Sequence, residues 1–190
     1  MTTPADALIP DGTTAAETEW AVVIASLPAG LRTIIGETVE THVAALAARF
    51  YNVMMGIPEA STYLDHHLVE SRLNLGLQRW LTDLFVETRT TSLAAAVAHQ
   101  HRVGDTHART KIPIHLVGRG ARHLKHSIWE LLTRNPAIDR SDLRHAVIYV
   151  NDLIDIAVEI MNTAFVRNSA RAARTDEAYR LLSLSQDLAV

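Results

Sequence analysis

A histidine in the middle of the chain occupies an inward-facing position of a predicted helix. His107 ends a series of residues spaced by four, three, four and three positions, which places them on one helical face. The series is Leu93, Val97, Gln100, Gly104 and His107. A buried neutral imidazole needs a partner. The iron of a haem group is one candidate, because a histidine is a common axial ligand; a backbone carbonyl in an ordinary core is the other. Gly104 leaves room where a flat macrocycle could pass.

A tyrosine on an earlier predicted helix is the second polar residue that the pattern turns inward. Tyr51 follows Phe50 and lies near the stripe that contains Ala47 and Met54. A buried phenol needs a hydrogen-bond partner, and a dioxygen ligand could accept a bond from it. Alternatively, the ring packs in the core while the hydroxyl reaches the surface. Spacing alone leaves both interpretations open.

The other histidines give weaker evidence for a functional site than His107 does, and the familiar catalytic motifs are missing. The chain has ten histidines, of which His123 and His126 are three residues apart and could share a metal. They sit among Arg122 and Lys125, so a solvated basic face is the better interpretation. The sequence contains no HExxH zinc motif, GxSxG nucleophile motif, paired carboxylate site or phosphate-binding glycine loop. It therefore indicates no catalytic residue.

Composition excludes several classes of protein. Lys and Arg number 18 against 21 Asp and Glu, a formal net charge of -3, which gives no electrostatic case for nucleic acid or an anionic membrane. Cysteine is absent, which excludes disulfides, thiol nucleophiles and cysteine-ligated metals. The start lacks the features of a signal peptide, and no apolar stretch approaches the ~20 residues of a membrane span. We expect a soluble, cytoplasmic protein without nucleic-acid or membrane partners.

Helical periodicity runs through most of the 190 residues, and glycine and proline fall at its breaks. Ser92 and either Asp139 or Ser141 could cap helices. The predicted helices cover residues 20–27, 30–55, 67–88, 92–111, 113–134 and 139–165 or beyond, followed by a trailing amphipathic segment. No alternating run indicates a strand. The pattern predicts one all-α domain, although periodicity alone does not distinguish it from other helical bundles.

Several segments resemble one known family. Residues 101–125 read HRVGDTHARTKIPIHLVGRGARHLK, which contains a V-x-x-x-H-A-R-x-x-I-P pattern around His107. The chain also reads ARFY at 48–51, VESRLNLGLQRW at 69–80, DIAVEIMNTAF at 155–165 and DEAYR at 176–180. These segments, in this order, are similar to those of globin-coupled sensors, especially the haem globin domains that precede diguanylate cyclase domains. The resemblance implies a globin-like helical fold.

The resemblance also implies a cofactor and roles for particular residues. The cofactor would be haem b, iron protoporphyrin IX, with His107 as its proximal ligand and Tyr51 as the distal donor to oxygen. Leu73 takes the place of a distal-helix residue that gates water and ligand. The implied haem-contacting residues are Phe50, Leu77, Trp80 and Ile114. Because Leu73 and Leu77 make this helix apolar, the second distal donor of some relatives is in doubt here.

The function that the resemblance implies is sensing of a diatomic gas, most of all O2, with CO and NO as further ligands. Residues 16–168 would form the sensor globin, 1–15 a flexible tail, and 169–190 the start of a linker to an output domain. The family's usual output is a GGDEF diguanylate cyclase that makes cyclic di-GMP from GTP. No GGDEF sequence occurs here, so this chain itself would not be an enzyme.

The same resemblance implies a homodimer through the last two globin helices, at 113–134 and 139–165. Three other functions stay open on the sequence. One is a stand-alone globin that consumes O2 or NO. Another is a sensor of CO, NO or redox state. The third is a haem-free helical interaction module.

Overall fold

The structure, a computed structural model, describes residues 12–64, 67, 69–86 and 92–187, and all regular structure in these ranges is helical. In chain order the elements are α1 (Gly12–Ala25), α2 (Ala29–Met55), the 3₁₀ turn η1 (Ala60–Thr62), the π-helix η2 (Val69–Leu73), α4 (Asn74–Phe85), α5 (Leu93–Arg109), α6 (Ile114–Arg134) and α7 (Arg140–Asp187). The all-α prediction is confirmed. The predicted helix 67–88 divides into a π-helix and an α-helix, and its residues 68, 87 and 88 lie outside the described ranges.

The helix starts follow from capping residues in the sequence. The Ser92 hydroxyl accepts a hydrogen bond from the Ala95 amide at 3.2 Å and caps α5. At the start of α7, the Asp139 carboxylate accepts from the Ser141 hydroxyl at 2.7 Å and from the Asp142 amide at 2.8 Å. These bonds lower the pKa of Asp139, the Ser141 hydroxyl most of all. Of the two candidates, Asp139 is therefore the cap, and Ser141 supports it.

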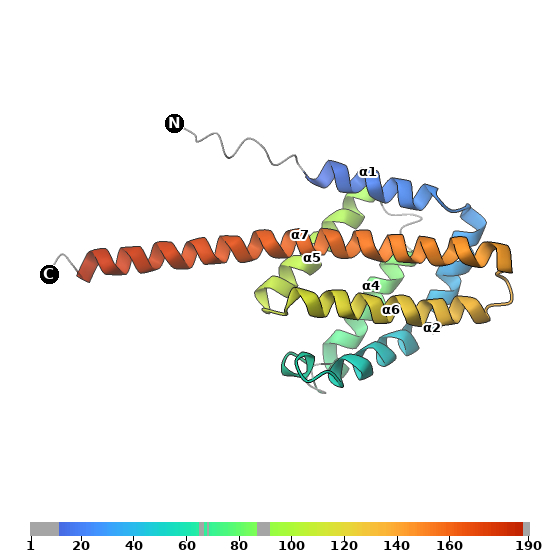
Figure 1. Cartoon of the computed structure of the whole chain (residues 1–190), viewed down its shortest axis with the longest axis horizontal. Coiled ribbons are helices and arrows are strands. Elements are labelled where there is room, and N and C mark those ends of the chain that lie inside the picture. Colours follow the sequence, from blue (N-terminus) through green and yellow to red (C-terminus); the bar gives the residue numbers. More distant parts are fainter. Residues whose placement is uncertain (1–11, 65–66, 68, 87–91, 188–190) are drawn as a thin grey trace.

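The core forms where α7 packs on α5 and α6 and where α2 packs on α4 (Figure 1). Large apolar side chains from most of the helices meet there without contact with solvent. The most deeply buried are Trp20, Ile35, Leu81, Leu84, Val97, Ile128, Leu132, Leu153 and Ile154. Each such side chain contributes about 1.5–3 kcal/mol by leaving water, which is enough to fix how the site-bearing helices cross.

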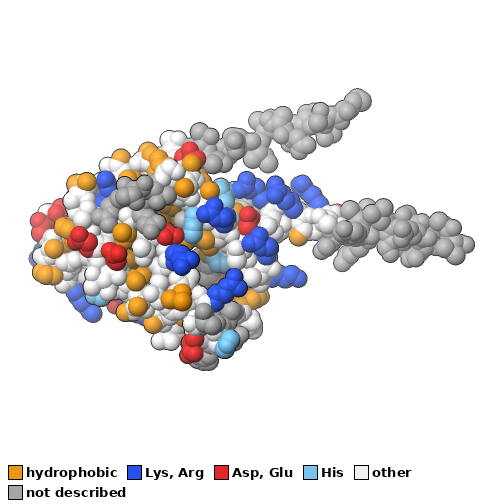
Figure 2. Space-filling view, turned by 180° about the vertical axis from the view of Figure 1, so that it is seen from behind, with side chains coloured by type: hydrophobic (Ala, Val, Ile, Leu, Met, Phe, Trp, Pro, Cys, Tyr) orange, Lys and Arg blue, Asp and Glu red, His pale blue; other side chains and the backbone are white. Residues whose placement is uncertain are grey.

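The last helix includes the segment that the sequence pattern predicts as a separate trailing piece. Helix α7 runs for 48 residues without a break, whereas we expected a helix at 139–165 or beyond and then a trailing amphipathic segment. Among the side chains whose burial the structure describes, up to residue 175 and at 177, Ala164 is the last buried one, and those of residues 169–175 are exposed. Figure 1 shows the C-terminal part of α7 projecting beyond the other helices. Lys and Arg side chains gather around the base of this projection (Figure 2).

The two chain ends lie partly outside the described residues. Residues 1–11 of the predicted tail and residues 188–190 of the predicted linker are among them, and α1 already begins at Gly12. In the described part, no helix is by itself long and apolar enough to cross a membrane. Two consecutive helical segments, Ala15–Ala25 and Ala29–Met55, would together be long and apolar enough, but the chain bends by 98° between them.

Candidate functional site

Tyr51 lies on the inner face of α2, as its position in the pattern predicts. The residue is 8% exposed, and burial raises the pKa of its hydroxyl to about 12. The phenol therefore keeps its proton across the physiological pH range and acts as a donor. It donates to the backbone carbonyl of Leu73 at 3.0 Å. The interpretation in which the hydroxyl reaches solvent is wrong.

Leu73 ends the π-helix η2 and directly precedes α4. The side chain of Leu73 is partly buried, while its backbone oxygen accepts the bond from Tyr51. Single π turns within α-helices are uncommon and often occur at functional sites. The structure thus brings Tyr51 and Leu73 together, as the prediction of a shared distal site requires, but through a backbone atom that no sequence pattern reveals.

His107 lies near the end of α5, and its ring is largely buried. Its Nδ1 atom is buried and has no hydrogen-bond partner in the part of the chain that the structure describes. Burial lowers the pKa of His107, so the imidazole is neutral at physiological pH. The alternative of a core histidine bonded to a carbonyl through Nδ1 therefore does not hold in this structure. A neutral imidazole is the form that binds a metal.

The backbone of His107 is tied to the turn that leads into α6. The Ile112 amide donates to the His107 carbonyl at 3.1 Å, and the Lys111 amide donates to the Ala108 carbonyl at 3.1 Å. Lys111 has a φ of 55°. This combination is a Schellman motif, in which the left-handed position usually holds glycine. A lysine there costs roughly 1 kcal/mol, and the turn fixes His107 relative to Pro113 and α6.

Gly104 does not have the role that its position suggested. A Cβ atom at Gly104 would lie 2.1 Å from the backbone oxygen of Met161 on α7. The missing side chain therefore lets α5 and α7 touch backbone to backbone, and it provides no space for a macrocycle. Gly120 on α6 similarly accommodates the ring of Phe50, which would come within 2.8 Å of a Cβ there. Both glycines serve close packing between helices.

The four predicted cofactor-contacting residues lie on three helices. Phe50 packs edge-on against the Tyr51 ring, with the ring centroids 4.9 Å apart. Trp80 is buried in α4, Leu77 is partly buried against the main core, and Ile114 is partly buried as the first residue of α6. All four side chains are apolar or aromatic and at least partly buried, which suits the walls of a haem pocket. Contact of these residues with a cofactor stays a prediction.

Gln100 is a polar residue whose partner sequence reasoning missed. It is 2% exposed on α5, and its Oε1 accepts a hydrogen bond from the indole nitrogen of Trp80 at 2.8 Å. The bond joins α4, which follows Leu73, to α5, which carries His107. The signal was available, since Gln100 lies on the same inward stripe as His107 and a buried amide needs a partner.

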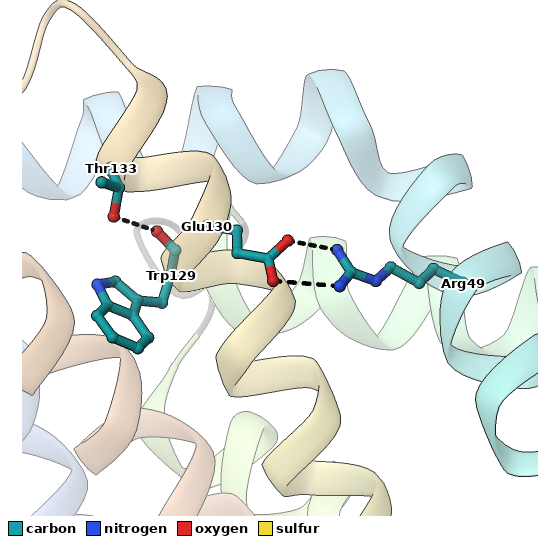
Figure 3. Close-up of polar contacts among 4 residues, drawn as sticks. All are labelled: Arg49, Trp129, Glu130 and Thr133. Carbon is teal, nitrogen blue, oxygen red and sulfur yellow. Dashed lines mark hydrogen bonds and ion pairs between the residues drawn. The ribbon is translucent and has the colours of Figure 1, made fainter.

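The outer face of α6 carries a hollow of about 390 Å³ against α7, lined by Arg122, Lys125, His126, Trp129, Val147, Asn151 and Asp155. The Trp129 side chain is 51% exposed, although tryptophan is usually more buried. Figure 3 shows it on the opposite side of α6 from Glu130, whose carboxylate accepts two hydrogen bonds from Arg49, at 2.6 and 3.2 Å. Arg49 lowers the pKa of Glu130. Trp129 therefore lines a hollow on the outer surface of α6 and leaves half of its own surface exposed to solvent.

Comparison with solved structures identifies the fold. The globin domain of DosC from E. coli, in its ferric form, matches with a TM-score of 0.72 at 24% identity, over 78% of this chain and 99% of that one. The globin domain of a Geobacter sulfurreducens globin-coupled sensor matches with a TM-score of 0.67 at 22% identity, over 80% and 96%. The arrangement of helices around Tyr51 and His107 is therefore a globin fold, as predicted.

Sequence comparison identifies the family. The protoglobin model matches residues 31–171, and the chain belongs to the protoglobin family. The diguanylate cyclase DosC of Escherichia coli K12 is 27% identical over 169 residues, which cover 89% of this chain and 36% of DosC. DosC of Shigella boydii matches to the same extent. The chain thus spans little more than a third of these relatives, and the predicted relation to globin-coupled sensors is confirmed.

Proposed function

We propose that this chain is a haem-based sensor of a diatomic gas, most of all O2, and that CO and NO are further ligands. The observation that carries the proposal is His107, a buried and neutral histidine of a globin fold whose Nδ1 has no partner among the described residues. A structural histidine would use that atom for a hydrogen bond. An axial ligand needs a neutral ring on a fixed backbone, and the Schellman motif fixes the backbone of His107.

The cofactor we propose is haem b, whose ferrous iron binds diatomic gases reversibly. His107 would supply the proximal ligand through a ring nitrogen of its neutral imidazole. Phe50, Leu77, Trp80 and Ile114 would line the macrocycle with apolar surface and keep bulk water away. No three His, Cys, Asp or Glu side chains gather to form a metal site within the described residues.

Tyr51 is the proposed distal donor. Tyr51 is buried and keeps its proton, and it lies in the segment ARFY, which resembles the distal tyrosine segment of globin-coupled sensors. Dioxygen in a ferrous haem protein carries partial negative charge, and hydrogen bonds to charged acceptors are about twice as strong as those between neutral groups. CO gains less because it carries little charge. Leu73, partly buried at the end of the π turn, would control the entry of water and gas.

The output would lie beyond this chain. We propose that residues 16–168 form the sensor and that 169–190 begin the linker, because an unbroken run of exposed side chains, at residues 169–175, begins there and the helix continues outward. The DosC relatives are diguanylate cyclases, and this chain matches 36% of their length. The intact protein would accordingly be a diguanylate cyclase that the sensor regulates, while this chain alone would carry no such activity.

We further propose a homodimer through α6 and α7. Trp129 on α6 and Ile148 on α7 are large apolar side chains that are 51% and 44% exposed, and Trp129 also lines the hollow between the two helices, together with Val147 of α7. We expect light scattering at micromolar concentration to give about twice the mass of the 21.0 kDa chain. Trp129→Asp should shift the protein toward the monomer because it would bury a charge. A monomeric wild-type chain would contradict this proposal.

The visible absorption spectrum tests the function as a whole. The purified chain, supplied with hemin, is recorded in the ferric state, after reduction, and then under O2 and under CO. We expect a Soret band that shifts reversibly with both gases. The absence of a Soret band would remove the haem proposal and leave a helical interaction module. A band that responds to CO but not to O2 would retain the cofactor and reject oxygen as the ligand.

A further inference from the structure

The hydroxyl of Tyr51 already has an acceptor inside the protein. It donates to the Leu73 carbonyl at 3.0 Å, and the residue is 8% exposed, so this bond is largely sheltered from water. A phenol has a single proton and can donate one full hydrogen bond at a time. Any ligand that takes the Tyr51 hydrogen bond must therefore take it from Leu73.

The accepting carbonyl belongs to a part of the helix that needs support. Leu73 is the last residue of the π-helix Val69–Leu73, and α4 begins at Asn74. The hydrogen bonds of a π-helix join residues five apart and those of an α-helix join residues four apart, so the pairing changes register at this junction. A π turn is rare because it is less favourable than an α turn. The hydrogen bond from Tyr51, which belongs to another helix, therefore stabilises this junction from outside.

We propose that the Leu73 carbonyl is the resting acceptor of Tyr51, and that oxygen binding transfers the Tyr51 hydrogen bond away from it and releases the π turn. This inference rests on the proposed oxygen-sensing function. It makes Leu73 a competitor for the distal donor through its backbone, in addition to any role of its side chain. The distal helix then differs between an oxygen-bound and a carbon-monoxide-bound protein, even though both gases occupy the same pocket.

The direction of the transfer follows from the strengths of the two acceptors. A partly anionic oxygen ligand accepts a stronger hydrogen bond than a neutral amide carbonyl. Carbon monoxide is a poorer acceptor than the carbonyl, so the Tyr51–Leu73 bond persists in its presence. Tyr51 stays protonated throughout, because burial raises the pKa of its hydroxyl to about 12. The gas alone, and not the pH, decides which acceptor is used.

Amide hydrogen exchange, followed by mass spectrometry on the haem-loaded ferrous chain, tests this proposal. We expect the peptide that covers residues 69–77 to exchange roughly fivefold faster under O2 than under CO, the ratio that loss of one neutral hydrogen bond produces. In Tyr51→Phe the hydrogen bond to the Leu73 carbonyl is absent under both gases, so this peptide should exchange fast and at the same rate under O2 and CO. Tyr63→Phe is the matched control; Tyr63 packs beside Met54 and Leu116, and this variant should keep the difference between the gases.

The outcomes separate this inference from the proposed function. The Soret band of each sample is recorded before exchange begins. A Soret band that responds to both gases, together with equal exchange under both in the wild-type chain, overturns the inference alone. A gas difference that survives in Tyr51→Phe also overturns it, because the difference would then arise elsewhere. A chain that takes up no haem overturns both proposals.

Discussion

Replacing His107 by alanine is expected to abolish stable haem binding while the chain stays helical. Removal of a hydrogen bond that orients a metal ligand typically lowers metal affinity by about 10–100-fold, so loss of the only proposed protein ligand should lower hemin affinity by more than that. The reduced variant should lack the Soret shift under O2. Hemin titration followed by absorbance measures the affinity, and far-UV circular dichroism checks the helices.

Two controls separate a ligand from a structural residue. His145→Ala removes an exposed imidazole of α7 whose Nδ1 lies 3.2 Å from the Ser141 carbonyl, and this variant should bind hemin like the wild-type chain. Free imidazole added to His107→Ala should restore a Soret band, because it can enter the space left by the side chain and bind the iron. A His107→Ala chain with unchanged hemin affinity would exclude His107 as the ligand.

Most of the helices could be predicted because capping residues and prolines in the sequence mark where they begin. Ser92 and Asp139 form side-chain bonds with nearby amides, and prolines precede α2 and α6. The continuity of α7 with the trailing segment could not be predicted in this way. The polar residues from Asn168 onward suggested that the trailing segment is separate, but a solvated helix can continue where each residue has adequate helical propensity and no proline or glycine interrupts it. Residues 166–187 contain neither proline nor glycine.

The inward orientation of Tyr51 and the largely buried position of His107 could be predicted from periodicity, whereas their surroundings could not. Gly104 illustrates the limit, since the same stripe that contains His107 also contacts α7, and only the crossing of α5 and α7 decides which neighbour the glycine meets. The acceptor of Tyr51 is a backbone oxygen 22 residues away, and every residue has such an atom. Sequence patterns indicate which side chains need a partner, but the partner depends on how the helices pack in the tertiary structure.

Tyr51→Phe is expected to weaken oxygen binding much more than carbon monoxide binding. A hydrogen bond to a charged acceptor contributes about 1.5–3 kcal/mol, and the bond to the Leu73 carbonyl that must be broken contributes about 1 kcal/mol. The net loss of about 0.5–2 kcal/mol corresponds to a roughly 2–30-fold faster release of O2. Competition from Leu73 thus makes the effect smaller than the hydrogen bond to oxygen alone would give.

Stopped-flow release of each gas from the ferrous chain measures this effect. The rate constant for CO release should change by less than about threefold, because CO accepts at most a weak hydrogen bond from the Tyr51 hydroxyl. Loss of the Tyr51–Leu73 hydrogen bond does not itself affect the iron. Tyr63→Phe should release both gases at the wild-type rate. Equal changes for O2 and CO in Tyr51→Phe would mean that the phenol shapes the pocket without bonding to oxygen. A change for O2 far above 30-fold would mean that Leu73 does not compete for Tyr51, since the net loss would then equal the full strength of the bond to a charged acceptor.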